Sequence, residues 1–275
     1  MAFDKVLLLQ ITTALTLLAI LIADLRFLIN YKTLFADKGL LSWNILRHYR
    51  SRYFRKKIPD TIYSGKWFWI VLISRVVLIC IFLSLFRLEL NFYSELTLAL
   101  ILALTMLISF RAGFIHTGAT ELTSITLFII CISSFFHSPA VISLGLCAIA
   151  LQTIICYAVN GLVKAMERKW RSGEYLAGIA QTTSFSISPI RTIVSKIDRK
   201  YIGYVSVLVI SFEIGFILTP FLPLPVLIGV LLIGIAFHLY NSIVMGLGTF
   251  FWVFIATYPA IIYLNQLIHQ YLGAS

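Results

Sequence analysis

The stretch from Trp67 to Arg87 reads WFWIVLISRVVLICIFLSLFR, and Arg75 is the only charged side chain before the Arg87 that closes it. An α-helix rises about 1.5 Å per residue, so a run of about 20 apolar residues crosses a hydrocarbon core about 30 Å thick. The length and composition of this stretch therefore predict a helix that spans a membrane.

Similar apolar runs occupy most of the remaining chain. We predict spans at 6–29, 67–87, 92–110, 120–136, 139–165, 201–220, 224–245 and 247–268. Of the 275 residues, 60% are hydrophobic and 12% are charged, whereas soluble domains carry roughly 25% charged residues. The sequence thus predicts an all-α, polytopic membrane protein with about eight transmembrane helices in a single domain over residues 1–275.

Basic residues gather in two longer connections, at 30–66 and 166–200. Within the first, the segment LLSWNILRHYRSRYF (40–54) is predicted to form an amphipathic helix on the membrane surface. Lys and Arg concentrate in alternate connections, so the positive-inside rule predicts that these connections face the cytoplasm and that both termini face outside. The net charge of +11 then reflects topology and contact with membrane lipid rather than nucleic-acid binding.

Several ionisable side chains lie inside the predicted spans, where a charge costs about 2.5–3.5 kcal/mol and usually faces the bundle interior. The candidates for a functional role among them are Asp24, Arg26, Arg75, Lys164, Glu213 and His238. Asp24 and Arg26 lie near the end of a span, where charged residues commonly anchor a helix. The helical rise predicts one polar layer near the basic face, with Glu213 beneath it as a floor. That layer comprises Arg75, Lys164, His238 and Asn241.

Each member of this layer also has an ordinary structural role open to it. Lys164 can extend its ammonium to the headgroups. Arg75 can pair with a carboxylate, and His238 and Asn241 can hydrogen-bond neighbouring helices. The four cysteines show no spacing that predicts a disulfide framework or a metal site. Position alone leaves the structural and functional roles of the layer open.

Two segments resemble the membrane domain of vitamin K-dependent gamma-carboxylases, the horizontally transferred transmembrane family. The first, at 152–173, reads QTIICYAVNGLVKAMERKWRSG. Its residues that match the family pattern are Gln152, Tyr157, Gly161, Lys164, Trp170 and Gly173. The second, FHLYNSIVMGLGTF at 237–250, resembles an F-H-x-x-N-S pattern at Phe237, His238, Asn241 and Ser242. The family's acidic residue about a helix earlier falls on Glu213. By this resemblance the chain looks like a short bacterial member of the family, of the SdpB type.

The resemblance implies a catalytic base at Lys164, assisted by His238, and a quinone or hydroquinone as cofactor. Burial disfavours the charged form of a lysine, and a neutral amine can accept a proton. The implied ligand contacts, with Arg75 added from the polar layer, are Arg75, Gln152, Tyr157, Trp170, Glu213 and Asn241. A second carboxylase histidine, from an N-N-H-x-Y-L segment, has no counterpart, because Ala119 stands in its place.

Two classes of function follow from these expectations. The first is a membrane enzyme, or enzyme subunit, that binds a quinone or another apolar ligand and modifies a peptide. The second is a non-enzymatic, SdpB-like partner in maturing or exporting a secreted peptide, working with a small accessory protein. A transporter is a weaker third reading, because no inverted repeat or matched pair of broken helices is evident. The resemblance implies a bacterial cytoplasmic membrane as the location.

Overall fold

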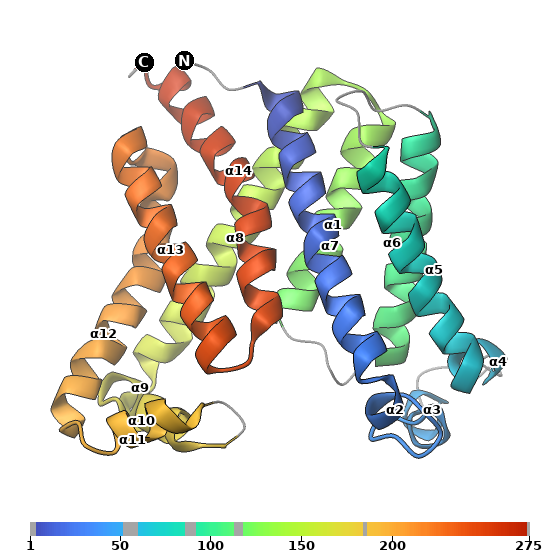
Figure 1. The fold of residues 1–275 in the computed structure, drawn as a ribbon. Helices are drawn as coiled ribbons and strands as arrows, with labels where there is room; N and C mark the ends of the chain where they lie inside the picture. Colours follow the sequence, from blue (N-terminus) through green and yellow to red (C-terminus); the bar gives the residue numbers. More distant parts are fainter. Residues whose placement is uncertain (1–3, 52–59, 86–91, 113–117, 184–185, 274–275) are drawn as a thin grey trace. The chain divides into compact units, whose positions relative to one another are not determined.

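The computed structural model describes residues 4–51, 60–85, 92–112, 118–183 and 186–273. Within these ranges the regular structure is helical throughout (Figure 1). It contains 8 helices that are long and apolar enough to cross a membrane, which confirms the predicted fold class. A hydrocarbon solvent favours this result, because a helix satisfies its own backbone hydrogen bonds.

The long helices follow the predicted spans closely. They are α1 (Lys5–Ile29), α5 (Gly65–Ser84), α6 (Phe92–Ala112), α7 (Gly118–Phe135), α8 (Pro139–Met166), α12 (Arg199–Gly215), α13 (Leu224–Val244) and α14 (Gly248–Tyr271). Helix α12 continues as a 3-10 turn, η1 (Phe216–Phe221). The predicted end of the second span, at 87, falls outside the described residues.

The two basic connections form short helices. The first contains α2 (Tyr31–Leu34), α3 (Trp43–Ser51) and α4 (Asp60–Tyr63), and the second contains α9 (Arg168–Arg171), α10 (Glu174–Gln181) and α11 (Ser188–Val194). Helix α3 lies inside the predicted surface helix. It buries Trp43 and Leu46 and exposes Arg47 and His48, so its described part is amphipathic as expected.

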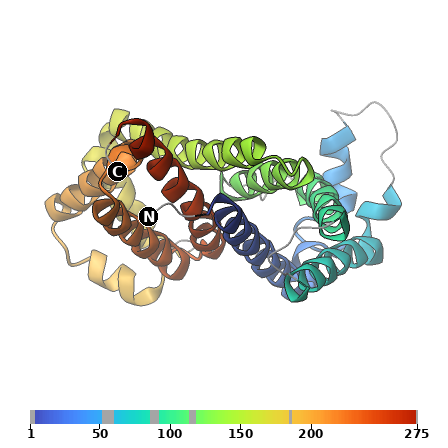
Figure 2. The same ribbon diagram turned by 90° about the horizontal axis from the view of Figure 1, so that it is seen from above.

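The chain divides into two compact units, Met1–Thr12 with Pro139–Ser275 and Thr13–Ser138. In the first unit, α8 packs against α12 and α14, and α13 packs against α14 (Figure 2). In the second unit, α6 packs against both α5 and α7. A single domain over the whole chain stays a prediction.

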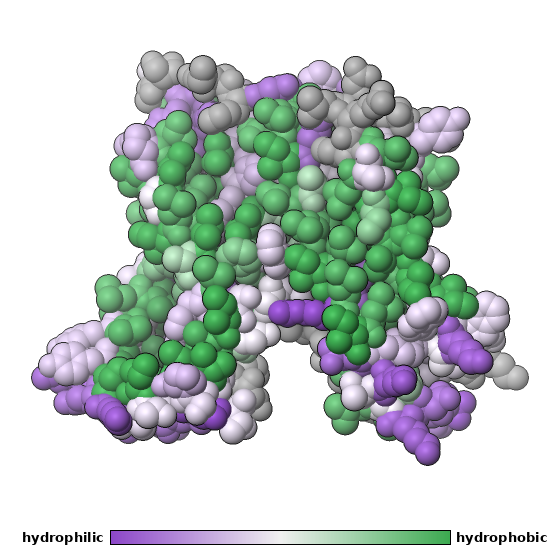
Figure 3. Space-filling model, in the orientation of Figure 1, coloured by the Kyte–Doolittle hydropathy of each residue, from purple (hydrophilic) through white to green (hydrophobic). Residues whose placement is uncertain are grey.

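The long helices carry apolar side chains on their outer surfaces. Helix α5 exposes Ile70, Val77 and Ile81, while it buries Leu72 and the charged Arg75. Figure 3 shows hydrophobic residues along the long helices and hydrophilic residues gathered around the short ones. Exposed apolar and buried ionisable side chains are the pattern expected when lipid is the solvent.

Candidate functional site

An ion pair joins α8 to α12 in the first unit. The Lys164 ammonium donates to both carboxylate oxygens of Glu213, with Nζ–Oε1 and Nζ–Oε2 distances of 2.5 and 2.8 Å. The Lys164 side chain is 19% exposed and that of Glu213 is 6% exposed. A paired charge avoids most of the cost that an isolated ion pays inside a membrane. Lys164 therefore points into the bundle and pairs there, rather than extending to the headgroups.

Gly161 allows this pair to form, because it lets α8 and α12 approach closely. A Cβ atom at Gly161 would lie 2.8 Å from Cγ1 of Ile214 and 2.9 Å from Cβ of Glu213. Small residues at helix interfaces commonly serve this purpose in membrane proteins. Since Gly161 lies one turn before Lys164, the close approach falls next to the ion pair.

We expect Gly161→Ala to push α12 away and to cost about 1–3 kcal/mol through overpacking. Gly229→Ala on α13 is the matched control, because a Cβ atom there meets no atom within 4 Å. Unfolding of both variants in detergent micelles titrated with SDS checks the difference. Equal stability of the two variants would show that the α8–α12 contact tolerates a methyl group.

Trp170, on α9, covers the ammonium of the ion pair. Lys164 Nζ lies 5.3 Å from the Trp170 ring centroid, within the range of a cation–π contact. The Ser206 hydroxyl donates to the Trp170 carbonyl at 2.6 Å and ties α9 to α12. Gly173 has a φ of +74°, and a Cβ atom there would lie 2.6 Å from the Gly203 nitrogen. A glycine is therefore required for the chain to turn against α12.

A second polar group lies inside the same unit, where α8, α13 and α14 meet. The Tyr157 hydroxyl lies 2.6 Å from His238 Nε2 and 2.8 Å from the Tyr258 hydroxyl. Gly234 makes room for it, because a Cβ atom there would lie 2.3 Å from the Tyr258 hydroxyl oxygen. All three side chains are buried, so this network is shielded from both lipid and water.

Aromatic rings hold the network in place. The Tyr157 ring stacks on Phe216 with centroids 3.9 Å apart, and His238 stacks on Phe254 at 4.0 Å. His238 Nδ1 is buried and has no hydrogen-bond partner among the described residues. Buried polar atoms in native proteins are usually partnered, so this nitrogen is the open position of the network.

The other two candidates in this unit are less closely tied to these groups. The Gln152 amide nitrogen lies 3.8 Å from Sγ of Cys156, on its own helix. Asn241 is partly buried one turn beyond His238 on α13. The structure therefore brings Lys164, Glu213 and Trp170 into one group and Tyr157 and His238 into another.

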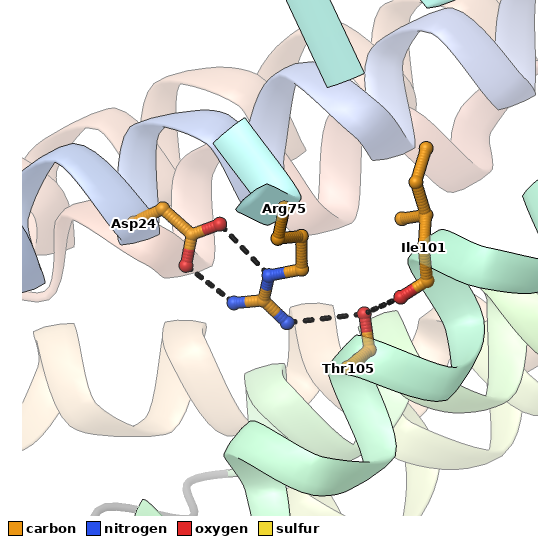
Figure 4. A network of polar contacts seen from close by, with 4 residues as sticks. All are labelled: Asp24, Arg75, Ile101 and Thr105. Carbon is orange, nitrogen blue, oxygen red and sulfur yellow. Dashed lines mark hydrogen bonds and ion pairs between the residues drawn. The ribbon is translucent and has the colours of Figure 1, made fainter. Parts of the chain in front are cut away.

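Arg75 belongs to the second unit, where it pairs with a carboxylate. Its guanidinium forms two hydrogen bonds to Asp24, and its Nη1 donates to the Thr105 hydroxyl at 3.0 Å (Figure 4). Asp24 is fully buried, so the expectation that it anchors a helix end is wrong. Asp24 can be buried because Arg75 donates two parallel N–H hydrogen bonds to its carboxylate, which offset the cost of removing that charge from water.

Tyr258 and Arg111 are two buried residues that the sequence analysis did not single out. Tyr258 lies in an apolar span with no spacing to mark it, and only the meeting of three helices reveals its role. Arg111 lies in the last turn of α6, is 1% exposed, and lies among aromatic rings. Its guanidinium carbon is 5.1 Å from the Phe68 centroid and 5.4 Å from those of Phe35 and Trp43. The aromatic residues of the first connection could have indicated this site, because aromatic rings commonly contact a buried cation.

The fold and its buried charges define this chain as a polytopic helical membrane protein. No family model, curated protein or solved structure matches it.

Proposed function

We propose that the first unit binds a quinone-like ligand and uses Lys164 as a base, as the membrane domain of the gamma-carboxylases does. The observation that carries the proposal is the Lys164–Glu213–Trp170 group. Its three members come from the residues on which the resemblance rests. The proposed setting is an enzyme, or a subunit of one, that modifies a peptide in a bacterial membrane.

The pairing with Glu213 supports a base at Lys164. Lys164 and Glu213 share one proton between an amine and a carboxylate. In surroundings of low dielectric, transfer of this proton to the carboxylate gives two neutral groups and so avoids two separate charges. In the proposed step, the Lys164 ammonium passes its proton to the Glu213 carboxylate, and the lone pair of the amine then accepts the proton of the ligand hydroxyl. A bound hydroquinone supplies an acidic hydroxyl. The Trp170 ring stabilises the ammonium once Lys164 holds the proton.

The buried tyrosine and histidine network supports a second contact with the ligand. Tyr157 and Lys164 lie on one face of α8, two turns or about 10 Å apart along the helix axis. A fused aromatic ring system with polar atoms at both ends can span this distance. His238 Nδ1, with no partner among the described residues, is the atom that we assign to the second polar end.

The test uses menadiol, a short naphthohydroquinone, and its dimethyl ether, which has no hydroxyl proton to give. We expect the intact protein in detergent to bind menadiol at least about tenfold more tightly than the dimethyl ether, since a charge-assisted hydrogen bond contributes about 1.5–3 kcal/mol. Lys164→Met removes this preference, because no amine remains to take the proton. Lys169→Met, at an exposed lysine of α9, keeps it. Isothermal titration calorimetry measures both affinities.

Two outcomes would refute the proposal. If the protein bound neither compound and organic extracts of the purified protein held no quinone, the proposal of a quinone-like ligand would be refuted. If the unmodified protein bound both compounds equally, the proposal that Lys164 acts as a base would be refuted. Co-purification of a small accessory protein in place of a quinone favours the non-enzymatic, SdpB-like role.

A further inference from the structure

A cavity of about 430 Å³ lies in the second unit, between α2 and the start of α5. Among the residues that line it are Tyr31, Lys32, Asp37, Lys66, Trp69 and Ile70. The candidate site in the first unit uses none of them. The cavity therefore calls for an explanation of its own.

The cavity lies where two spans reach the membrane surface. Helix α1 ends at Ile29, directly before the lining residues of α2, and α5 begins at Gly65. Trp69 and Ile70, on the first turns of α5, are 45% and 46% exposed. Tryptophan is enriched where the hydrocarbon core meets the headgroups. We therefore expect the cavity to open at the depth of lipid headgroups, with Trp69 and Ile70 on the side toward the hydrocarbon core.

Three charged side chains line this cavity. Lys32 and Lys66 supply two ammonium groups, and Asp37 supplies one carboxylate. All three side chains are exposed, and none has an ion-pair partner among the described residues. The cavity therefore presents both signs of charge to a ligand.

The wall of the cavity is fixed by the fold. The Tyr31 hydroxyl donates a hydrogen bond to the Gly65 carbonyl, and the Tyr31 ring packs against Phe35 and Phe68, with centroids 5.9 and 6.5 Å away. Gly65 has a φ of +37°, a backbone conformation that favours glycine. A Cβ atom there would have only Asp37 Oδ1 nearby, at 3.8 Å. The carboxylate thus lies beside the turn that opens α5.

We propose that this cavity binds a phospholipid with a phosphoethanolamine headgroup. The lipid phosphate accepts hydrogen bonds from Lys32 and Lys66, and its ammonium pairs with Asp37. One acyl chain runs along Trp69 and Ile70 toward the membrane core. The carboxylate decides for a zwitterionic lipid, because the phosphate of a purely anionic lipid would meet Asp37 with no positive group to offset it.

Native mass spectrometry of the full chain tests this, after exchange into detergent holding equal amounts of phosphatidylethanolamine and phosphatidylglycerol. We expect about threefold more phosphatidylethanolamine to be retained, since an ion pair at an exposed carboxylate contributes only modestly. Asp37→Asn removes the preference, and Lys32→Gln with Lys66→Gln abolishes retention of both lipids. Lys38→Gln, next to Asp37 but outside the cavity lining, leaves retention unchanged.

All these substitutions replace exposed side chains, so each variant should fold, and circular dichroism verifies it. Equal retention of both lipids by the unmodified protein would overturn the proposal. So would a preference for phosphatidylglycerol, which would indicate a purely anionic ligand. An Asp37→Asn variant that keeps the original preference would remove the role of the carboxylate and the proposal with it.

Discussion

Asp24→Ala is expected to lower the free energy of unfolding by about 3–5 kcal/mol, the cost of breaking a buried ion pair from one side. The Asp24 and Arg75 side chains are 0% and 5% exposed. Without the carboxylate, the guanidinium keeps only the Thr105 hydroxyl as a side-chain partner among the described residues. Unfolding in detergent micelles titrated with SDS measures the loss.

Removing both charges is expected to restore most of this stability. Asp24→Leu combined with Arg75→Met fills the same space with apolar atoms, and such replacements of buried pairs are often neutral or stabilising. Arg26→Ala is the control, because Arg26 lies two residues further along α1 and is exposed. If the double variant were no more stable than Asp24→Ala, Asp24 and Arg75 would not act as one unit.

Lys164→Met is expected to have the second largest effect, because it leaves the Glu213 carboxylate buried without its partner. Partial exposure of Lys164, at 19%, places the expected loss at the lower end, about 3 kcal/mol. Combining it with Glu213→Leu removes both charges and should recover most of that loss. SDS-induced unfolding of the single and double variants gives both values.

The double variant also separates folding from function. It should be as well folded as the unmodified protein, and yet bind menadiol and its dimethyl ether equally, since no amine remains at position 164. Preference for menadiol in this folded variant would contradict the proposed base. If both single variants were fully stable, the ion pair would contribute nothing to folding.

The sequence predicted the spans well because each is a local property. Length and apolar composition decide whether about 20 residues cross a membrane, and every predicted span corresponds to a helix. The amphipathic helix in the first connection followed from local pattern in the same way, and α3 has it with buried Trp43 and exposed Arg47, while its place on the membrane surface stays a prediction. The family resemblance also singled out Gly161, Lys164 and Trp170, of which the first two lie one turn apart on α8 and the third on α9.

The partners of the ionisable residues depend on the tertiary structure. Depth along the membrane suggested one layer containing Arg75 and Lys164, but depth does not say which helices are neighbours or which way a side chain points. The fold gives Arg75 a partner on α1 and Lys164 a partner on α12. The contacts of Tyr258 and Arg111 likewise join residues that are distant in sequence.

Hydropathy by itself thus determined that this chain is a polytopic helical membrane protein, because the free energy of transferring a segment into lipid is a sum over the residues of that segment. Only the tertiary structure decided how its buried charges are neutralised. That depends on the rotation and neighbours of each helix, and hence on close contacts such as the one at Gly161.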